Sequence, residues 1–131
     1  MKLTPVIITL LTIFSAAGAQ ASISLSCQGS VDKSLSFTAD IDSSGRGNLK
    51  VNHGGKSDQQ GIRLTSKPGV GSDNYSFESN GGDGAISYTL DIRKHLVAEK
   101  TTGITTDVNL FIGQPYDDAS FAYGLICKIS Q

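Results

Sequence analysis

Apolar and polar residues alternate with a period of two through most of this chain of 131 residues. The alternation is clearest at residues 22–27, 34–41, 48–51 and 86–93. Because successive side chains of a β-strand point to opposite faces of a sheet, this pattern predicts strands that bury one face and expose the other. Shorter strand candidates lie at 62–64, 75–77, 96–100, 107–113 and 120–129. We therefore expect an all-β fold.

Turn-forming residues separate these predicted strands. Glycine, asparagine, aspartate and serine gather at 42–47, 52–55 and 80–84, and these residues favour tight turns. Strands spaced at about 8–12 residues are typical of a β-sandwich or a small antiparallel barrel of about eight strands, and the sequence leaves both open. The best helical candidate, 91–100, keeps an apolar stripe for only about two turns, so we expect strand rather than helix there.

The two cysteines, Cys27 and Cys127, fall in the first and last predicted strands. Both lie on the apolar face of their strand, which predicts one buried disulfide joining the two strands, with a pair of free buried thiols as the alternative. Closing a loop of this length contributes up to about 4.7 kcal/mol in the chain-entropy model. A bridge between neighbouring strands would favour the barrel, and a bridge between two layers would favour the sandwich.

The first 21 residues have the pattern of a secretory signal peptide. Lys2 precedes an apolar run at 6–14, and small residues follow up to Ala21, so we expect cleavage before Ser22, with cleavage after Ala19 as the alternative. The apolar run is much shorter than the roughly 20 residues that span a bilayer. We therefore expect a single all-β domain at 22–131 that is periplasmic or secreted and has no stable membrane anchor.

Charge and motifs exclude several function classes. Removal of residues 1–21 leaves ten cations and twelve acids, a net charge of −2 without the basic patches of nucleic-acid binders. The stretch 40–45 resembles the start of a calcium loop, but Val51 stands where the loop needs glutamate. The histidine and glycines at 53–55 are not followed by a nucleophile motif. We expect no metal, no cofactor and no enzymatic activity, and a hydrolase with an unrecognised site is the least favoured alternative.

Three places offer side chains for binding a partner. One is the loop with Tyr116, Asp117 and Asp118, and another is the outer face of the strand that carries Phe111, through which a homodimer is also conceivable. The third is Arg46 at a hairpin tip.

The tripeptide Ser44-Gly45-Arg46 at this tip resembles the Ser-Gly-Arg element in the inhibitory loop of periplasmic lysozyme inhibitors. The rest of that family's pattern is not apparent in the sequence, so these three residues do not identify a family.

These features predict an exported, non-enzymatic binding or inhibitor protein of the bacterial cell envelope. It would recognise a macromolecular partner, a protein or another envelope component, through its hairpin loops. The alternative is a carrier of a lipid or another small hydrophobic ligand, held in a cavity inside the barrel, because eight-stranded barrels can enclose one small ligand. Against the carrier, the inward residues of 34–41 and 86–93 are large enough to fill a small core.

Overall fold

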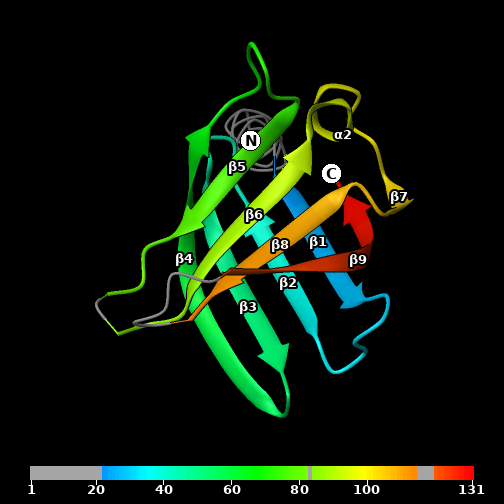
Figure 1. Cartoon of the computed structure of the whole chain (residues 1–131). Helices are drawn as coiled ribbons and strands as arrows, with labels where there is room; N and C mark the ends of the chain where they lie inside the picture. Colours follow the sequence, from blue (N-terminus) through cyan, green and yellow to red (C-terminus); the bar gives the residue numbers. More distant parts are fainter. Residues whose placement is uncertain (1–21, 83, 115–119) are drawn as a thin grey trace, which may run out of the picture.

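The computed structural model describes residues 22–82, 84–114 and 120–131. Most of these residues belong to strands, and within the described ranges the chain forms one short helix, α2, after β6 (Figure 1). In chain order the elements are β1 (Ile23–Gly29), β2 (Ser36–Ile41), β3 (Arg46–His53), β4 (Lys56–Ser66), β5 (Asn74–Ser79), β6 (Ser87–Arg93), α2 (Lys94–Ala98), β7 (Gly103–Thr105), β8 (Val108–Gly113) and β9 (Ser120–Ser130).

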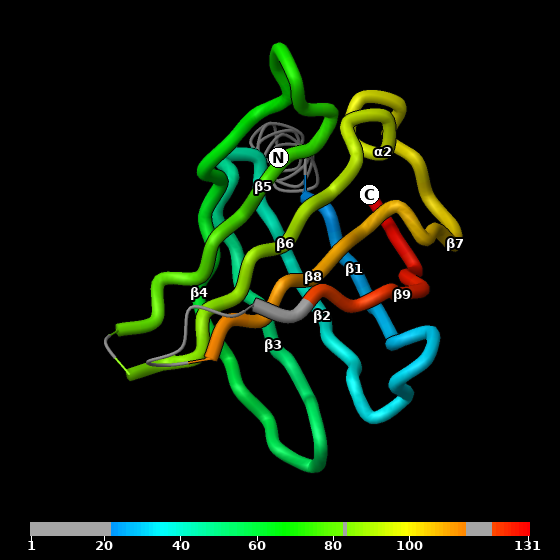
Figure 2. The backbone as a smooth tube through the Cα atoms, viewed as in Figure 1, coloured from blue at the N-terminus to red at the C-terminus, as the bar shows by residue number. Residues whose placement is uncertain are grey.

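The strands form one closed antiparallel barrel. From β1 to β6 each strand pairs with the next one along the chain, and β6 then pairs with β8 and β8 with β9. β1 also pairs with β9, over the register Ser24↔Ser130 to Gly29↔Leu125, and this closes the sheet on itself (Figure 2). The closed sheet confirms the prediction of an all-β fold and decides between its two forms in favour of the barrel.

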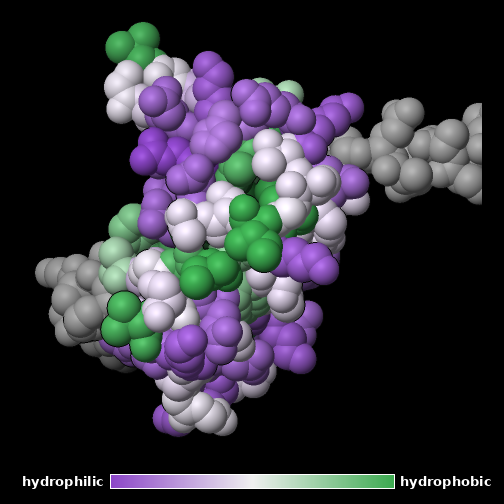
Figure 3. Space-filling view, turned by 90° about the vertical axis from the view of Figure 1, so that its right-hand side faces the viewer, coloured by the Kyte–Doolittle hydropathy of each residue, from purple (hydrophilic) through white to green (hydrophobic). Residues whose placement is uncertain are grey.

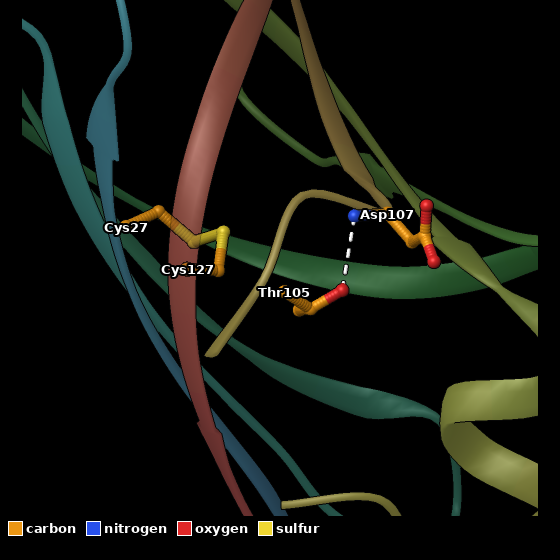
Figure 4. The surroundings of a disulfide bond; sticks show 4 residues. All are labelled: Cys27, Thr105, Asp107 and Cys127. Atoms are coloured by element: carbon orange, nitrogen blue, oxygen red, sulfur yellow. Dashed lines mark hydrogen bonds between the residues drawn. A yellow bond between two sulfur atoms is a disulfide. The ribbon is translucent and has the colours of Figure 1, made fainter. Parts of the chain in front are cut away.

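β7 and β8 act as one interrupted strand. Cys127 of β9 pairs with β1 on one side and with Thr105 of β7 on the other, so β7 lies on the same side of β9 as β8. The register shifts by one residue between the two segments, which is the signature of a β-bulge. The N–H of Asp107 donates to Oγ1 of Thr105 at 3.0 Å within this bulge (Figure 4). If β7 and β8 are counted as one strand, the barrel has eight strands.

The disulfide joins the first and last strands, as the sequence predicts. Cys27 and Cys127 are directly opposed in the β1–β9 register, with their Cα atoms 4.0 Å apart. Both side chains are buried, and Figure 4 shows the bridge that connects Cys27 of β1 to Cys127 of β9. The bridge therefore fixes the register of the pair that closes the barrel.

The core is made of the inward side chains of the strands. Alternation sends every second residue of each strand into the barrel, and most of these positions are large and apolar. Together with Leu35, just before β2, and Leu96 of α2, they make up the largest side chains with less than 2 % of their surface exposed: Phe37, Leu35, Leu49, Leu90, Ile92, Leu96, Leu110, Ile129, Val108 and Cys127.

The expected strand at 96–100 is wrong, because the chain forms the helix α2 at Lys94–Ala98. After β6 the chain must turn back to form β7 and β8, and a single helical turn does this while burying Leu96 at the end of the barrel. Val97 packs partly against the core beside it. Two adjacent apolar residues fit a short helix at a barrel end as well as a strand that is covered on both faces, so the local pattern did not separate them.

Replacing both Cys27 and Cys127 by alanine should lower the free energy of unfolding by about 2–5 kcal/mol. The strand pairing of β1 and β9 should persist, because their backbone hydrogen bonds do not depend on the sulfur atoms. Urea unfolding followed by circular dichroism measures the loss, and the far-ultraviolet spectrum of the folded variant checks the barrel. A variant as stable as the parent would contradict the role given to the bridge.

Candidate functional site

Polar residues replace apolar ones on the inner face of β4 near its start. Asp58 lies opposite Val51 of β3, and Gln60 lies opposite Leu49, so both side chains occupy inward positions. The apolar pattern returns at Ile62, which is buried. Inward polar groups do not help to fill a core and cost free energy unless they are hydrogen-bonded. This local break in the pattern therefore marks one end of the barrel as a candidate site.

A depression of about 400 Å³ opens at this end. It is formed where β3 and β8 end and where β4 and β6 begin, which are neighbouring ends of antiparallel strands. We call it the Asp58 mouth, and it is lined by Val51, His53, Lys56, Ser57, Asp58, Ile86, Tyr88, Ile112 and Gln114.

Hydrogen bonds hold the Asp58 carboxylate in place. Its Oδ2 accepts from the hydroxyl of Tyr88 at 2.9 Å and from the side-chain amide of Gln60 at 3.0 Å. The same amide also donates to the carbonyl of Ile86 at 2.8 Å, which ties β4 to the start of β6. No described residue donates to Oδ1 of Asp58.

Tyr88 acts as a fixed hydrogen-bond donor to Asp58. Its side chain is buried, and this burial raises the pKa of its hydroxyl far above the ordinary value of 10.0. The nearby Asp58 carboxylate raises the pKa further by accepting a hydrogen bond from the protonated hydroxyl and by its negative charge. Tyr88 is therefore protonated at any physiological pH.

A second polar pair lies at the same end. Nε2 of His53 is 3.1 Å from Oδ2 of Asp32, which belongs to the connection between β1 and β2. The His53 ring also meets the ring of Tyr123 edge-on, with the ring centres 5.5 Å apart. His53 thus connects three parts of the barrel that are far apart in the sequence. The pKa of Asp32 lies below its ordinary value, first because Ser34 donates to its carboxylate and next because His53 does.

This arrangement suits binding better than nucleophilic catalysis. A serine nucleophile needs its hydroxyl hydrogen-bonded to the histidine that takes its proton. Here Ser34 donates its hydroxyl to Asp32, and His53 contacts the other oxygen of the same carboxylate. Within the described residues there is also no group of three or more histidine, cysteine, aspartate or glutamate side chains able to hold a metal ion.

Of the binding residues expected from the sequence, the two that the structure describes, Arg46 and Phe111, do not meet in one place. Tyr116, Asp117 and Asp118 lie outside the described residues. Arg46 is exposed at the start of β3, directly opposite Arg63 of β4. Phe111 is partly exposed on the outer face of β8.

Arg46 and Phe111 belong to one row of outward residues that crosses the sheet. Three strands separate them, so they do not form a single contact patch. The residues that lie between them in this row are Arg63, Glu78 and Thr89.

The outer wall near β7 and β9 carries two exposed apolar residues. Ile104 has 80 % and Ile126 has 47 % of its surface exposed. Ile104 lies opposite Lys128, two residues from Ile126 on the same face of β9. Figure 3 shows hydrophobic surface across the middle of the side on which these strands lie.

A homodimer through the Phe111 face stays a prediction.

Sequence reasoning missed the residues that build the Asp58 mouth. Asp58 and Gln60 could have been found from the sequence, because they are polar residues at inward positions of a strand, where apolar residues are expected. His53 and Asp32 could not, since their contact arises from two connections whose closeness is set by the barrel.

Comparison with known proteins found no matching family model, no matching curated protein and no matching solved structure. The disulfide is compatible with an oxidising extracellular compartment. None of the helices in the described ranges has the length and apolar character needed to cross a membrane.

Replacing Ser34 by alanine should raise the pKa of Asp32 toward 3.8, because it removes the hydrogen bond that lowers this pKa most. A carboxyl with a lowered folded-state pKa stabilises the fold above its unfolded pKa, and this contribution is lost as the pH falls through the folded value. Carbon-13 NMR titration of the aspartate carboxyls measures the change.

Ser44→Ala is the matched control for this titration, because Ser44 lowers the pKa of Asp42 in the same way. It should move the Asp42 titration and leave that of Asp32 in place. An Asp32 pKa that does not change in Ser34→Ala would contradict the assignment.

Proposed function

We propose that this chain is a non-enzymatic binding protein, exported to the bacterial cell envelope or beyond, that recognises a macromolecular partner through the Asp58 mouth. Such a partner inserts a lysine or arginine side chain into the depression and pairs it with the Asp58 carboxylate. The residues around the mouth position this carboxylate before binding.

The observation that carries the proposal is the half-buried Asp58 carboxylate, with one oxygen held and the other without a donor among the described residues. Tyr88 and Gln60 both donate to Oδ2, so the carboxylate keeps its orientation without the partner. A pre-positioned acceptor avoids part of the ordering cost of binding. Charge-assisted hydrogen bonds to a carboxylate are also stronger than neutral ones.

The surroundings of Asp58 also suit a cationic side chain. Tyr88 lies in the lining of the depression, and Val51, Ile86 and Ile112 supply apolar surface for the stem of a lysine or arginine. Long cationic side chains commonly bury their stems in this way while their charged ends meet polar groups. Arginine is among the residues that contribute most to protein interfaces.

A macromolecular partner fits this site better than a ligand enclosed inside the barrel. The middle of the barrel is filled by buried side chains such as Phe37, Leu49 and Leu90. The Asp58 mouth is instead a surface depression at the strand ends, next to the connections between β1 and β2 and between β3 and β4. A partner that reaches into it also contacts these connections.

Export is the remaining part of the proposal. It is supported by the signal-peptide pattern of residues 1–21 and by a disulfide that is stable in an oxidising compartment. The periplasm or the medium provides such a compartment.

The test is affinity capture with the purified protein, its disulfide intact, from envelope extracts and host secretions. A retained macromolecule is identified, and its affinity is then measured for the parent and for Asp58→Asn. Loss of a desolvated charge pair should weaken binding about 30-fold or more, equivalent to about 2 kcal/mol. Asp91→Asn is the matched control, because Asp91 accepts a hydrogen bond from Ser76 on β5, away from the mouth.

Two results would contradict this proposal. One is that no macromolecule is retained from either source. The other is a partner whose affinity is unchanged in Asp58→Asn but falls in Arg46→Ala or Phe111→Ala, which would move the interface to another face. Tyr116→Ala tests the sequence-based candidate loop in the same assay.

A further inference from the structure

The opposite end of the barrel contains an apolar basin of about 420 Å³. This volume falls within the range of about 300–1,000 Å³ that is usual for small-molecule sites. Its apolar lining consists of Ile23, Ile41, Leu64, Tyr75, Phe77 and Val97, which come from β1, β2, β4, β5 and α2. We call this depression the α2 basin.

The α2 basin gathers hydrophobic side chains that the core leaves partly uncovered. Ile23, Leu64, Tyr75 and Val97 all pack against the core without being fully buried, and all four line the basin. Uncovered apolar surface that is concave and concentrated in one place favours an apolar ligand. The basin therefore offers a site for a hydrocarbon chain.

Two lysines supply the charge at the basin. Lys67 and Lys100 line it, both are exposed, and neither takes part in an ion pair with another described residue. The acid in the lining is Asp42, whose Oδ1 accepts from the backbone N–H groups of Ser44 and Arg46 within the hairpin turn. The lining thus holds two cations and one acid, a balance that favours an anion.

The position of Lys100 is unusual. Its φ angle of 50° lies in the left-handed region, where glycine is the common residue. The backbone closes α2 there through Lys100 N–H to the carbonyl of Val97 and Thr101 N–H to the carbonyl of Leu96, the hydrogen bonds of a Schellman motif. Glycine is the usual residue in this turn, so the lysine at this position departs from the local preference.

The end of the chain holds this turn against the barrel. The side-chain amide of Gln131 donates to the carbonyl of Leu96 at 2.8 Å and to that of Thr101 at 3.1 Å. These two contacts fix the segment on both sides of Lys100. The backbone that carries the Lys100 ammonium group is therefore held in place on both sides.

We propose that the α2 basin binds a free single-chain amphiphile with a carboxylate head group. Its hydrocarbon chain lies on the apolar lining, and its carboxylate meets the ammonium groups of Lys67 and Lys100. This site is independent of the Asp58 mouth and goes beyond the proposed function. It also differs from a carrier cavity inside the barrel, because the basin lies at the barrel end and the core stays filled.

The experiment titrates dodecanoate, below the concentration at which it forms micelles, into the purified protein with its disulfide intact. Isothermal calorimetry or the NMR shifts of residues around Val97 report binding. Dodecyltrimethylammonium, with the same chain length and the opposite charge, is the matched probe. Dodecanoate should bind saturably with one site, and the cationic probe should bind more weakly.

Variants of the two lysines test the role of charge. Lys67→Ala and Lys100→Gly should each weaken dodecanoate binding by up to about fivefold, the range of an exposed ion pair. Lys50→Ala is the control, since Lys50 lies on the outer wall between Thr38 and Gln59. Lys100→Gly should also raise the melting temperature, because glycine relieves the left-handed backbone, so lost binding cannot be ascribed to lost folding.

Several outcomes would overturn the inference. These are an absence of saturable binding, equal binding of the anionic and cationic probes, or dodecanoate binding that is unchanged in both lysine variants. Binding to vesicles of anionic phospholipid without binding to monomeric dodecanoate would also overturn it, by replacing a free amphiphile with a membrane surface. The outcome at the Asp58 mouth is separate, because the capture assay uses different variants and a different ligand.

Discussion

The pairing of β1 with β9 is the contact on which the rest of the structure depends. Without it the sheet would have two long free edges, and the inward side chains would face water instead of one another. Six residues of β1, from Ser24 to Gly29, are in register with β9, and the Cys27–Cys127 bridge lies within this pairing. The bridge prevents the two strands from slipping, and a slip of one residue would exchange the inner and outer faces. Closure thus defines both the core and the two ends of the barrel.

Closure also determines where a ligand can act. The outer wall is largely polar and locally satisfied, as the hydrogen bonds from Ser24 to Asp40 and from Ser76 to Asp91 illustrate. The interior is filled by buried side chains. The two ends of the barrel are therefore the places that remain for a ligand, and they differ in chemistry. One presents the carboxylate of Asp58 among polar groups, and the other presents apolar side chains beside lysines.

The sequence predicted the fold well because the alternation was regular where the barrel wall is regular. Phe37 and Leu90 could be placed inside, and Cys27 could be paired with Cys127, from period and spacing alone. The prediction failed at Leu96 and Val97, where two adjacent apolar residues are compatible with helix and strand. It did not find the Asp58 mouth, since the approach of His53 to Asp32 depends on how the barrel brings two distant connections together. Of the residues that form the mouth, only the polar residues at inward positions of β4 could have been noticed in the sequence.

The two ends of the described chain lie at the same end of the barrel. Ile23 and Gln131 both line the α2 basin, while the Asp58 mouth is formed by strand ends at the far side. A tether that joins the barrel next to Ser22 or at Gln131, such as a resin linker or a fused domain, is therefore anchored beside the basin. The barrel then stands with its Asp58 mouth pointing away from the support. Attachment chemistry that uses the termini consequently leaves one recognition surface free and crowds the other.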